Sequence, residues 1–364
     1  MTNIKINSIW EAWVDQVSKI LVLVFGLTGF LFSSSANTSE YIFHNISLEE
    51  GLPSLEIQQT FQQSNGFIWF ATSRGVSRYD GITFRHFYFS PSSANHISNN
   101  FTSKIVEDKT GNIWLATEDG LNRINTDGSI DIFKESDGLP SSWILTALID
   151  SNDRLWIGTA QGLALYQKSN NQFTKIGGAS YISVNAISET HTGDILVSTY
   201  EGLTKLDLDG VTLVDVSINH PKFELFRNSY ITEINSLRNG WVAIGTEYNG
   251  LFLLNFETNE IVQYNQNSGL MGNSVASITQ IGEDQLWLAH YFNGISILNL
   301  GSNDISSIKN IPFDPYSIAS NNIRNIFQDS SDTIWIATDA GVSKLRPQQK
   351  GVYIYRALPN GKGL

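Results

Sequence analysis

Short runs of alternating apolar and polar residues recur along most of the chain, and they are rich in aromatic and β-branched side chains. The run IWFAT at residues 68–72 shows the pattern: a polar turn precedes it, and a glycine follows its threonine at the third position. Such alternation is typical of strands rather than helices. Because no segment after residue 37 shows a convincing helical period, the pattern predicts an all-β protein.

One unit of this kind occurs seven times. Its threonine position recurs at intervals of 40 to 48 residues, at Thr72, Thr117, Thr159, Thr199, Thr246, His290 and Thr338. This spacing is typical of four-stranded propeller blades. In the second copy the expected strands run from SKIVED at residues 103–108, the innermost, through NIWLAT and GLNRIN to SIDIFK at 129–134. The fold class that we predict is a seven-bladed β-propeller of four-stranded antiparallel blades.

Two features of the unit have a physical explanation. A glycine ends the turn after the threonine in every copy, which indicates a hairpin with a positive φ angle. Most copies carry a tryptophan with a small residue two positions later, so that both side chains lie on one sheet face and neighbouring blades can nest. The tryptophans are Trp69, Trp114, Trp156, Trp287 and Trp335. Leu196 and Ala243 replace the other two, and we expect Trp241 to compensate for Ala243 from the opposite face.

The seven copies, together with the turns EGLPS at residues 50–54 and DGLPSS at 137–142, resemble the two-component regulator propeller repeat family. The resemblance covers nearly all of the chain after its first 36 residues. It implies a periplasmic, ligand-binding input region of a membrane-bound sensor, with a histidine kinase or a GGDEF diguanylate cyclase as output. The sequence as far as Leu364 contains no kinase H-box, GGDEF string or second hydrophobic span. We therefore expect a non-catalytic sensor propeller that is a fragment of a longer protein or signals through a separate membrane partner.

The beginning of the chain predicts export. Residues 20–32 carry no charge and Lys19 precedes them, but the run is short for a membrane-spanning helix, which needs about 20 apolar residues. We interpret residues 1–36 as a signal peptide or an N-terminal membrane anchor, and either places the remainder in the periplasm or another extracytoplasmic space. Residues 37–350 are then the propeller, and 351–364 form an outer or closing strand or begin a missing second propeller. Residues 41–47 are an eighth candidate for an outer strand, which predicts that the ring closes by pairing the two chain ends.

Composition narrows the function classes. Acidic residues number 35 against 23 basic ones, for a net charge of −12, which argues against nucleic acid as a partner. The absence of cysteine excludes thiolate metal sites and cysteine nucleophiles. The six histidines form no metal-binding motif, and we interpret His290, at a repeat threonine position, as structural. We expect no catalytic residue, metal or cofactor; a secreted propeller enzyme such as a polysaccharide lyase, and a protein-interaction scaffold, are the alternatives.

The turns between the second and third strands of each unit are candidates for ligand binding. In the predicted topology they share a face with the loops leading into the inner strands, and their chemistry differs sharply between copies. Aromatic rings beside carboxylates and amides suit a small-molecule or oligosaccharide ligand. The candidate ligand-binding residues are Arg74, Glu118, Trp143, Tyr200, Glu201, Tyr248, Asn249, Tyr291 and Asn293. The alternative is that these are ordinary turn residues or the contact surface of a homodimer.

Overall fold

The computed structural model describes residues 41–93, 95–177, 182–207, 212–216, 221–226 and 229–346. The predicted signal peptide or anchor, residues 1–36, and the terminal segment 351–364 lie outside the described residues. Among the described residues, no helix has the length and apolar character that crossing a bilayer requires.

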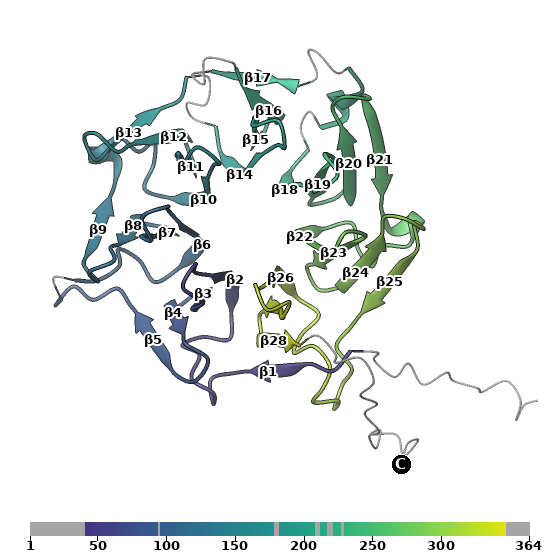
Figure 1. Cartoon of the computed structure of the whole chain (residues 1–364), viewed down its shortest axis with the longest axis horizontal. Coiled ribbons are helices and arrows are strands. Elements are labelled where there is room, and N and C mark those ends of the chain that lie inside the picture. The colour runs from purple at the N-terminus through teal and green to yellow at the C-terminus, as the bar shows by residue number, and fades with distance from the viewer. Residues whose placement is uncertain are drawn as a thin grey trace, which may run out of the picture. The chain divides into compact units, whose positions relative to one another are not determined.

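The described chain forms seven four-stranded antiparallel sheets arranged in a ring, which confirms the predicted β-propeller (Figure 1). Each sheet is one blade, and in the first six blades the four strands follow one another in sequence from the axis outward. Blades 1 to 4 consist of β2 (Ile57–Gln62), β3 (Ile68–Thr72), β4 (Gly75–Tyr79) and β5 (Phe84–Phe87); β6 (Thr102–Glu107), β7 (Ile113–Thr117), β8 (Gly120–Ile124) and β9 (Ile130–Phe133); β10 (Ile144–Ile149), β11 (Leu155–Thr159), β12 (Gly162–Gln167) and β13 (Gln172–Lys175); and β14 (Val184–Glu189), β15 (Ile195–Thr199), β16 (Gly202–Leu206) and β17 (Leu213–Asp215).

Blades 5 to 7 repeat this order. They consist of β18 (Ile231–Ser236), β19 (Val242–Thr246), β20 (Leu251–Asn255) and β21 (Glu260–Tyr264); β22 (Val275–Ile281), β23 (Gln285–His290), β24 (Gly294–Asn299) and β25 (Ile305–Ile308); and β26 (Ile323–Gln328), β27 (Ile334–Thr338) and β28 (Gly341–Leu345) with β1 (His44–Ile46). Within the described ranges, 3₁₀ turns lie between blades at η1 (Glu135–Asp137), η3 (Pro221–Phe226) and η4 (Gln266–Ser268).

The ring is closed by the first strand of the chain. β1 is the outer strand of blade 7 and pairs antiparallel with β28, with His44 opposite Lys344 and Ile46 opposite Val342. The predicted pairing of an N-terminal strand with a C-terminal one is therefore present. The closure protects β28, because a propeller blade without its fourth strand would leave an open sheet edge.

The hydrophobic core consists of seven separate clusters, one between each pair of neighbouring blades. The five repeat tryptophans are at most 2% exposed, and each packs against the following blade, as Trp114 does with Leu155 and Ile157. Ala116, two positions after Trp114, belongs to the same cluster. The prediction that ring and small residue share one face is confirmed.

One prediction about this packing is wrong. Trp241 lies in the same cluster as Ala243, between blades 5 and 6, and not on the opposite face. The reason is the strand geometry. Residues two positions apart point to the same side, so the large side chain of Trp241 lies on the same side as the small Ala243.

The repeated glycine has two roles. Gly120 has a φ of 125° and Gly75 a φ of 104°, values that favour glycine, and the other five copies are also positive. A Cβ on Gly120 would lie 2.9 Å from the carbonyl oxygen of Phe133 in the outer strand. The glycine thus allows both the turn and the close approach of the fourth strand.

Every inner strand carries a β-bulge at its second residue. In blade 2, Thr102 pairs with Thr117 and Lys104 with Ala116, so that Ser103 is the extra residue. The same shift of register occurs in all seven blades, and the extra residues are Gln58, Ser103, Leu145, Asn185, Thr232, Ala276 and Arg324. A bulge redirects the side chain of its extra residue, and bulges are frequent beside functional sites. We call these seven residues the axial collar.

Candidate functional site

The turns between second and third strands lie on the same face as the loops that lead into the inner strands, as predicted. Their backbones are directly bonded: the N–H of Gly75 donates to the carbonyl of Asn100 at 2.7 Å, and that of Gly120 to Ser142 at 2.7 Å. The repeat threonine stiffens each turn, because Thr117 Oγ1 donates to the carbonyl of Gly120 at 2.6 Å. We call this side of the ring the upper face, and the side with the other hairpin turns the lower face.

The nine predicted ligand-binding residues are distributed around the upper face rather than gathered at one point. They belong to the turns of blades 1, 2, 4, 5 and 6 and to the loop leading into blade 3. Trp143 is 52% exposed, Tyr200 56% and Tyr248 71%, whereas Tyr291 and Asn293 are half-buried. The side chains of Arg74, Glu118, Glu201 and Asn249 are exposed.

Tyr248 and Tyr291 are the predicted residues that the structure brings into one neighbourhood. Tyr230, at the start of blade 5, interacts electrostatically with both of them. Burial raises the pKa of the Tyr230 hydroxyl, and the charges of Glu247 and Tyr248 raise it further. Burial also raises the pKa of Tyr291, against the opposing charge of Arg324. The Tyr230 hydroxyl therefore lies near the charged turn of blade 5, and Tyr291, which lines the axial cavity, lies near the guanidinium of Arg324. Sequence reasoning missed Tyr230.

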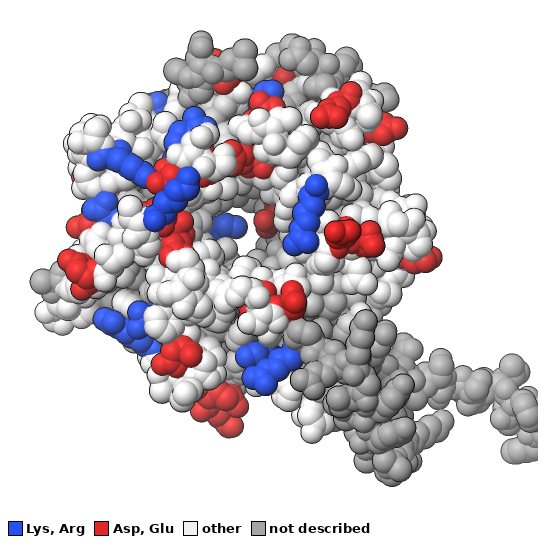
Figure 2. All heavy atoms as spheres, in the orientation of Figure 1, with Lys and Arg blue, Asp and Glu red and all other residues white. Residues whose placement is uncertain are grey.

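A cavity of about 260 Å³ lies at the axis, and all seven collar residues line it together with Tyr291. Figure 2 shows the hollow at the centre of the ring, with basic and acidic atoms on its wall. Of the nine predicted residues, Tyr291 is the one that lines this cavity. The other eight do not line this cavity.

Three charged side chains give the axial cavity its polarity: Lys104, Glu233 and Arg324. Arg324 Nη1 donates to Gln58 Oε1 at 3.2 Å, while its Nε is buried and has no hydrogen-bond partner among the described residues. Burial raises the pKa of Glu233, and the positive charge of Lys104 opposes this rise. The cavity thus offers guanidinium and ammonium donors to a negative or hydroxyl-bearing group, and a carboxylate to a donor.

The burial pattern of the inner strands reflects the collar. In a regular strand, residues on one face are two positions apart, so buried side chains normally recur at every second position. In four inner strands the buried positions are three apart instead, as in Ile57 and Thr60, Thr102 and Ile105, Ile231 and Ile234, and Ile323 and Ile326. This spacing marks the bulge, and the residue after the first buried position is the one directed to the axis.

His290 has a structural role in blade 6. Its side chain is fully buried; Nδ1 lies 2.9 Å from the carbonyl oxygen of Ser274, and Nε2 lies 2.8 Å from Ser296 Oγ. Both ring nitrogens are therefore used, with Nδ1–H as donor and Nε2 as acceptor. No cluster of three or more His, Asp or Glu side chains able to hold a metal ion occurs among the described residues.

Comparison with protein families agrees with the repeat. The family model described as "two component regulator propeller" matches residues 96–119, 138–161 and 317–340. These segments lead into blades 2, 3 and 7. In the same three blades the tryptophan Nε1 donates to an aspartate six residues earlier, at 2.8 to 2.9 Å: Trp114 to Asp108, Trp156 to Asp150 and Trp335 to Asp329. The match therefore falls on the blades with the complete hydrogen-bonded unit.

Similar proteins include signalling proteins and enzymes. Histidine kinase P4 of Formosa agariphila is 30% identical over 81% of this chain, which spans 26% of the kinase. The extracellular domain of a putative hybrid two-component system from B. thetaiotaomicron has a TM-score of 0.72 and 26% identity, covering 84% of this chain and 42% of that one. Virginiamycin B lyase from Staphylococcus aureus, at 14% identity and a TM-score of 0.65, covers 85% of this chain and all of its own length. The lyase shares the fold alone.

The chain thus spans about a quarter of its curated relative and less than half of the extracellular domain. The ring of seven blades, the repeat matches and the similarity to sensor regions agree with one another. The protein is a seven-bladed β-propeller that contains two-component regulator propeller repeats.

Proposed function

We propose that this propeller is the ligand-binding input domain of an extracytoplasmic sensor and that it has no catalytic activity of its own. The similarity to an extracellular domain of a hybrid two-component system supports the class of protein. The observation that carries the binding proposal is the axial cavity, where the seven collar residues, all of different type, converge under a face with exposed aromatic rings.

The chemistry of the cavity favours a small polar ligand rich in hydroxyl groups, such as an oligosaccharide end. A sugar ring would stack on Tyr248 and Tyr291 at the mouth, because aromatic faces bind the apolar side of such rings. Its hydroxyl or carboxylate oxygens would accept from Arg324, whose buried Nε would gain a partner. Glu233 would accept from a hydroxyl on the other side.

The experiment is a thermal-shift screen of the full chain against neutral and acidic oligosaccharides, since a ligand that binds the native state alone raises the melting temperature. For any oligosaccharide that binds, Arg324→Gln should weaken the affinity about tenfold, because it removes a charge-assisted hydrogen bond. Lys175→Gln, the same loss of charge on the exposed outer strand of blade 3, is the matched control. Equal affinities of the two variants would place the ligand elsewhere.

Two further measurements test the remaining parts of the proposal. Incubation of the purified chain with acidic glycans should release no unsaturated product, which a lyase would form and which absorbs in the ultraviolet. Residues 1–45 fused to alkaline phosphatase should give an active, exported enzyme if the leader functions as proposed. Product release would contradict the absence of catalysis, and an inactive fusion would contradict export.

A further inference from the structure

The interface between blades 4 and 5 lacks the tryptophan that five of the other blades carry at this position. In the blades with the complete unit, the tryptophan is 1 to 2% exposed and donates to the aspartate six residues earlier. Blade 4 has Leu196 at the tryptophan position and Thr190 at the aspartate position. Both members of the hydrogen-bonded pair are therefore replaced together.

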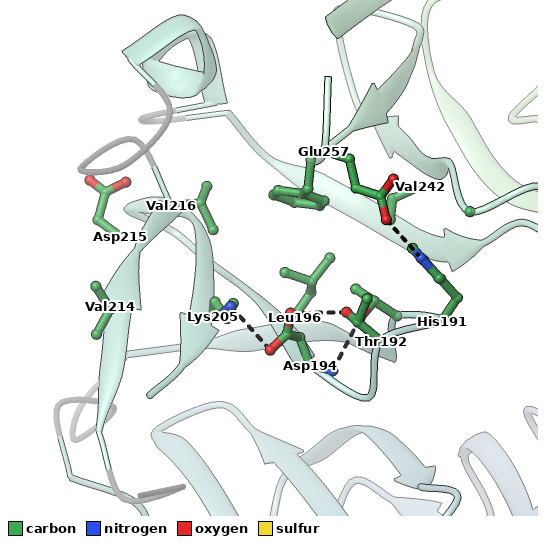
Figure 3. Close-up of a pocket in the computed structure, with 13 residues that line it drawn as sticks. His191, Thr192, Asp194, Leu196, Lys205, Val214, Asp215, Val216, Val242 and Glu257 are labelled. Carbon is green, nitrogen blue, oxygen red and sulfur yellow. Dashed lines mark hydrogen bonds and ion pairs between the residues drawn. The ribbon is translucent and has the colours of Figure 1, made fainter. Parts of the chain in front are cut away.

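A cavity of about 200 Å³ lies at this interface (Figure 3). Its apolar walls come from both blades: Leu196, Val214 and Val216 from blade 4, and Val242 and Phe256 from blade 5. The turns that border it, at residues 190–194 and at Gly240 and Glu257, belong to the lower face. The cavity is thus separate from the axial cavity and shares no lining residue with it.

The interface has not collapsed onto the smaller side chain. Phe223 and Phe226 of η3 join the cluster that contains Leu196 and Val242. Phe226 packs edge-on against Phe252 with ring centroids 5.0 Å apart, and Phe223 against Phe256 at 5.2 Å. These rings pack into the same interface, and the cavity remains beside them.

The rim of this cavity is acidic. The carboxylates of Asp194 and Glu257 lie at the rim together with the side chains of Lys205 and His191. Lys205 Nζ lies 3.0 Å from Asp194 Oδ1, and His191 Nε2 lies 3.5 Å from Glu257 Oε1 (Figure 3). The side chain of Glu257 is 74% exposed, so its carboxylate is open to a ligand from solvent. An apolar interior with a rim of excess negative charge is complementary to a cationic, partly apolar group.

We propose that this cavity binds a flat aromatic ring that carries a positively charged amine. The ring would enter against Leu196, Val242 and Phe256, in the place that an indole occupies in five of the other blades. Its ammonium group would remain at the rim, beside the carboxylates of Asp194 and Glu257. The propeller would then have two sites of opposite character, a polar one at the axis and an aromatic-cation site on the lower face.

The test uses tryptamine as probe and indole-3-propionate as its anionic counterpart, both measured by ligand-detected NMR on the full chain. For a ligand of this size we expect a Kd of about 1 mM for tryptamine. Indole-3-propionate should bind at least about threefold more weakly, because its carboxylate meets the acidic rim. No tryptamine binding, or equal binding of the two compounds, would overturn the proposal.

Two variants locate the site. Leu196→Trp fills the cavity with the side chain that five other blades carry at this position, and it should abolish tryptamine binding. Glu257→Gln, at an exposed position that leaves the fold unaffected, should weaken it about threefold. Glu283→Gln makes the same charge change on the lower face of blade 6 and should leave it unchanged. Full affinity in Leu196→Trp and Glu257→Gln would exclude this cavity. Arg324→Gln should not affect tryptamine, which separates this proposal from the axial site.

Discussion

The interface between blades 2 and 3 and that between blades 4 and 5 are built on the same repeat but are filled differently. Trp114 packs between Phe133 and Tyr166, with ring centroids 5.5 and 4.9 Å away, and the guanidinium of Arg123 lies 5.3 Å from the indole. At the other interface Leu196 takes the tryptophan position, and phenylalanines from η3 supply the aromatic packing. Where the tryptophan and its aspartate are both present, the interface is filled, and where blade 4 lacks both of them a cavity remains.

The largest expected effect separates these two interfaces directly. Trp114→Ala should lower the free energy of unfolding by about 3–5 kcal/mol, because it empties a fully packed position. Leu196→Ala should cost about 2 kcal/mol, at the low end for a buried leucine, since its surroundings already include a cavity. Urea denaturation of both variants measures the difference. Equal losses would mean that the interface of blades 4 and 5 is as tightly packed as that of blades 2 and 3.

Blade 6 departs from the repeat in another way, which makes its stability depend on pH. Burial lowers the pKa of His290 to about 4 from the ordinary 6.5, although the hydrogen bond to the Ser274 carbonyl opposes this. The folded state therefore favours the neutral ring, while the unfolded state takes up a proton below pH 6.5. The stabilisation present above pH 6.5 should be lost as the pH falls toward 4, by about 3 kcal/mol.

The measurement is the difference in melting temperature between wild type and His290→Thr at several pH values. His290→Thr restores the repeat residue, so titrations of all other groups cancel in the difference. The wild type should lose stability faster than the variant between pH 6.5 and 4. Parallel curves would show that His290 titrates alike in both states.

The turn aspartate offers a smaller test of the same unit. Burial raises the pKa of Asp108, but hydrogen bonds from Thr110, Trp114 and Asn112 together lower it below the ordinary value. Asp108→Ala should cost about 2 kcal/mol, because it leaves the buried indole N–H without its acceptor. Thr190→Ala, at the same position of blade 4, should cost less than about 1 kcal/mol, since Thr190 bonds only to its own turn in the described structure. Urea midpoints of the two variants compare them, and a larger loss from Thr190→Ala would contradict the pairing.

These contrasts also show what could be predicted from the sequence. The repeat was sufficient to predict the fold, because a tryptophan, a small residue and a glycine at a turn recur at similar offsets in most copies. It also placed the upper face, which follows from strand order. The axial collar could not be found from residue type, since its seven members share a position and no chemistry. The sequence shows that blade 4 lacks the tryptophan–aspartate pair, because Leu196 and Thr190 stand at the two positions. It does not show how the interface is packed instead, because Phe223 and Phe226 come from outside the repeat.

The smallest expected effect is a gain. Leu196→Trp alone fills the cavity but buries an indole N–H without an acceptor, and Thr190→Asp alone adds a carboxylate near Asp194. Together they rebuild the pair of the complete blades, and the double variant should be more stable than wild type by about 1 kcal/mol, as cavity-filling changes commonly are. A double-mutant cycle from urea midpoints should give a favourable coupling of about 1 kcal/mol. Additive effects would mean that the new indole does not contact residue 190. The cavity would then not correspond to the space that the tryptophan fills in five of the other blades.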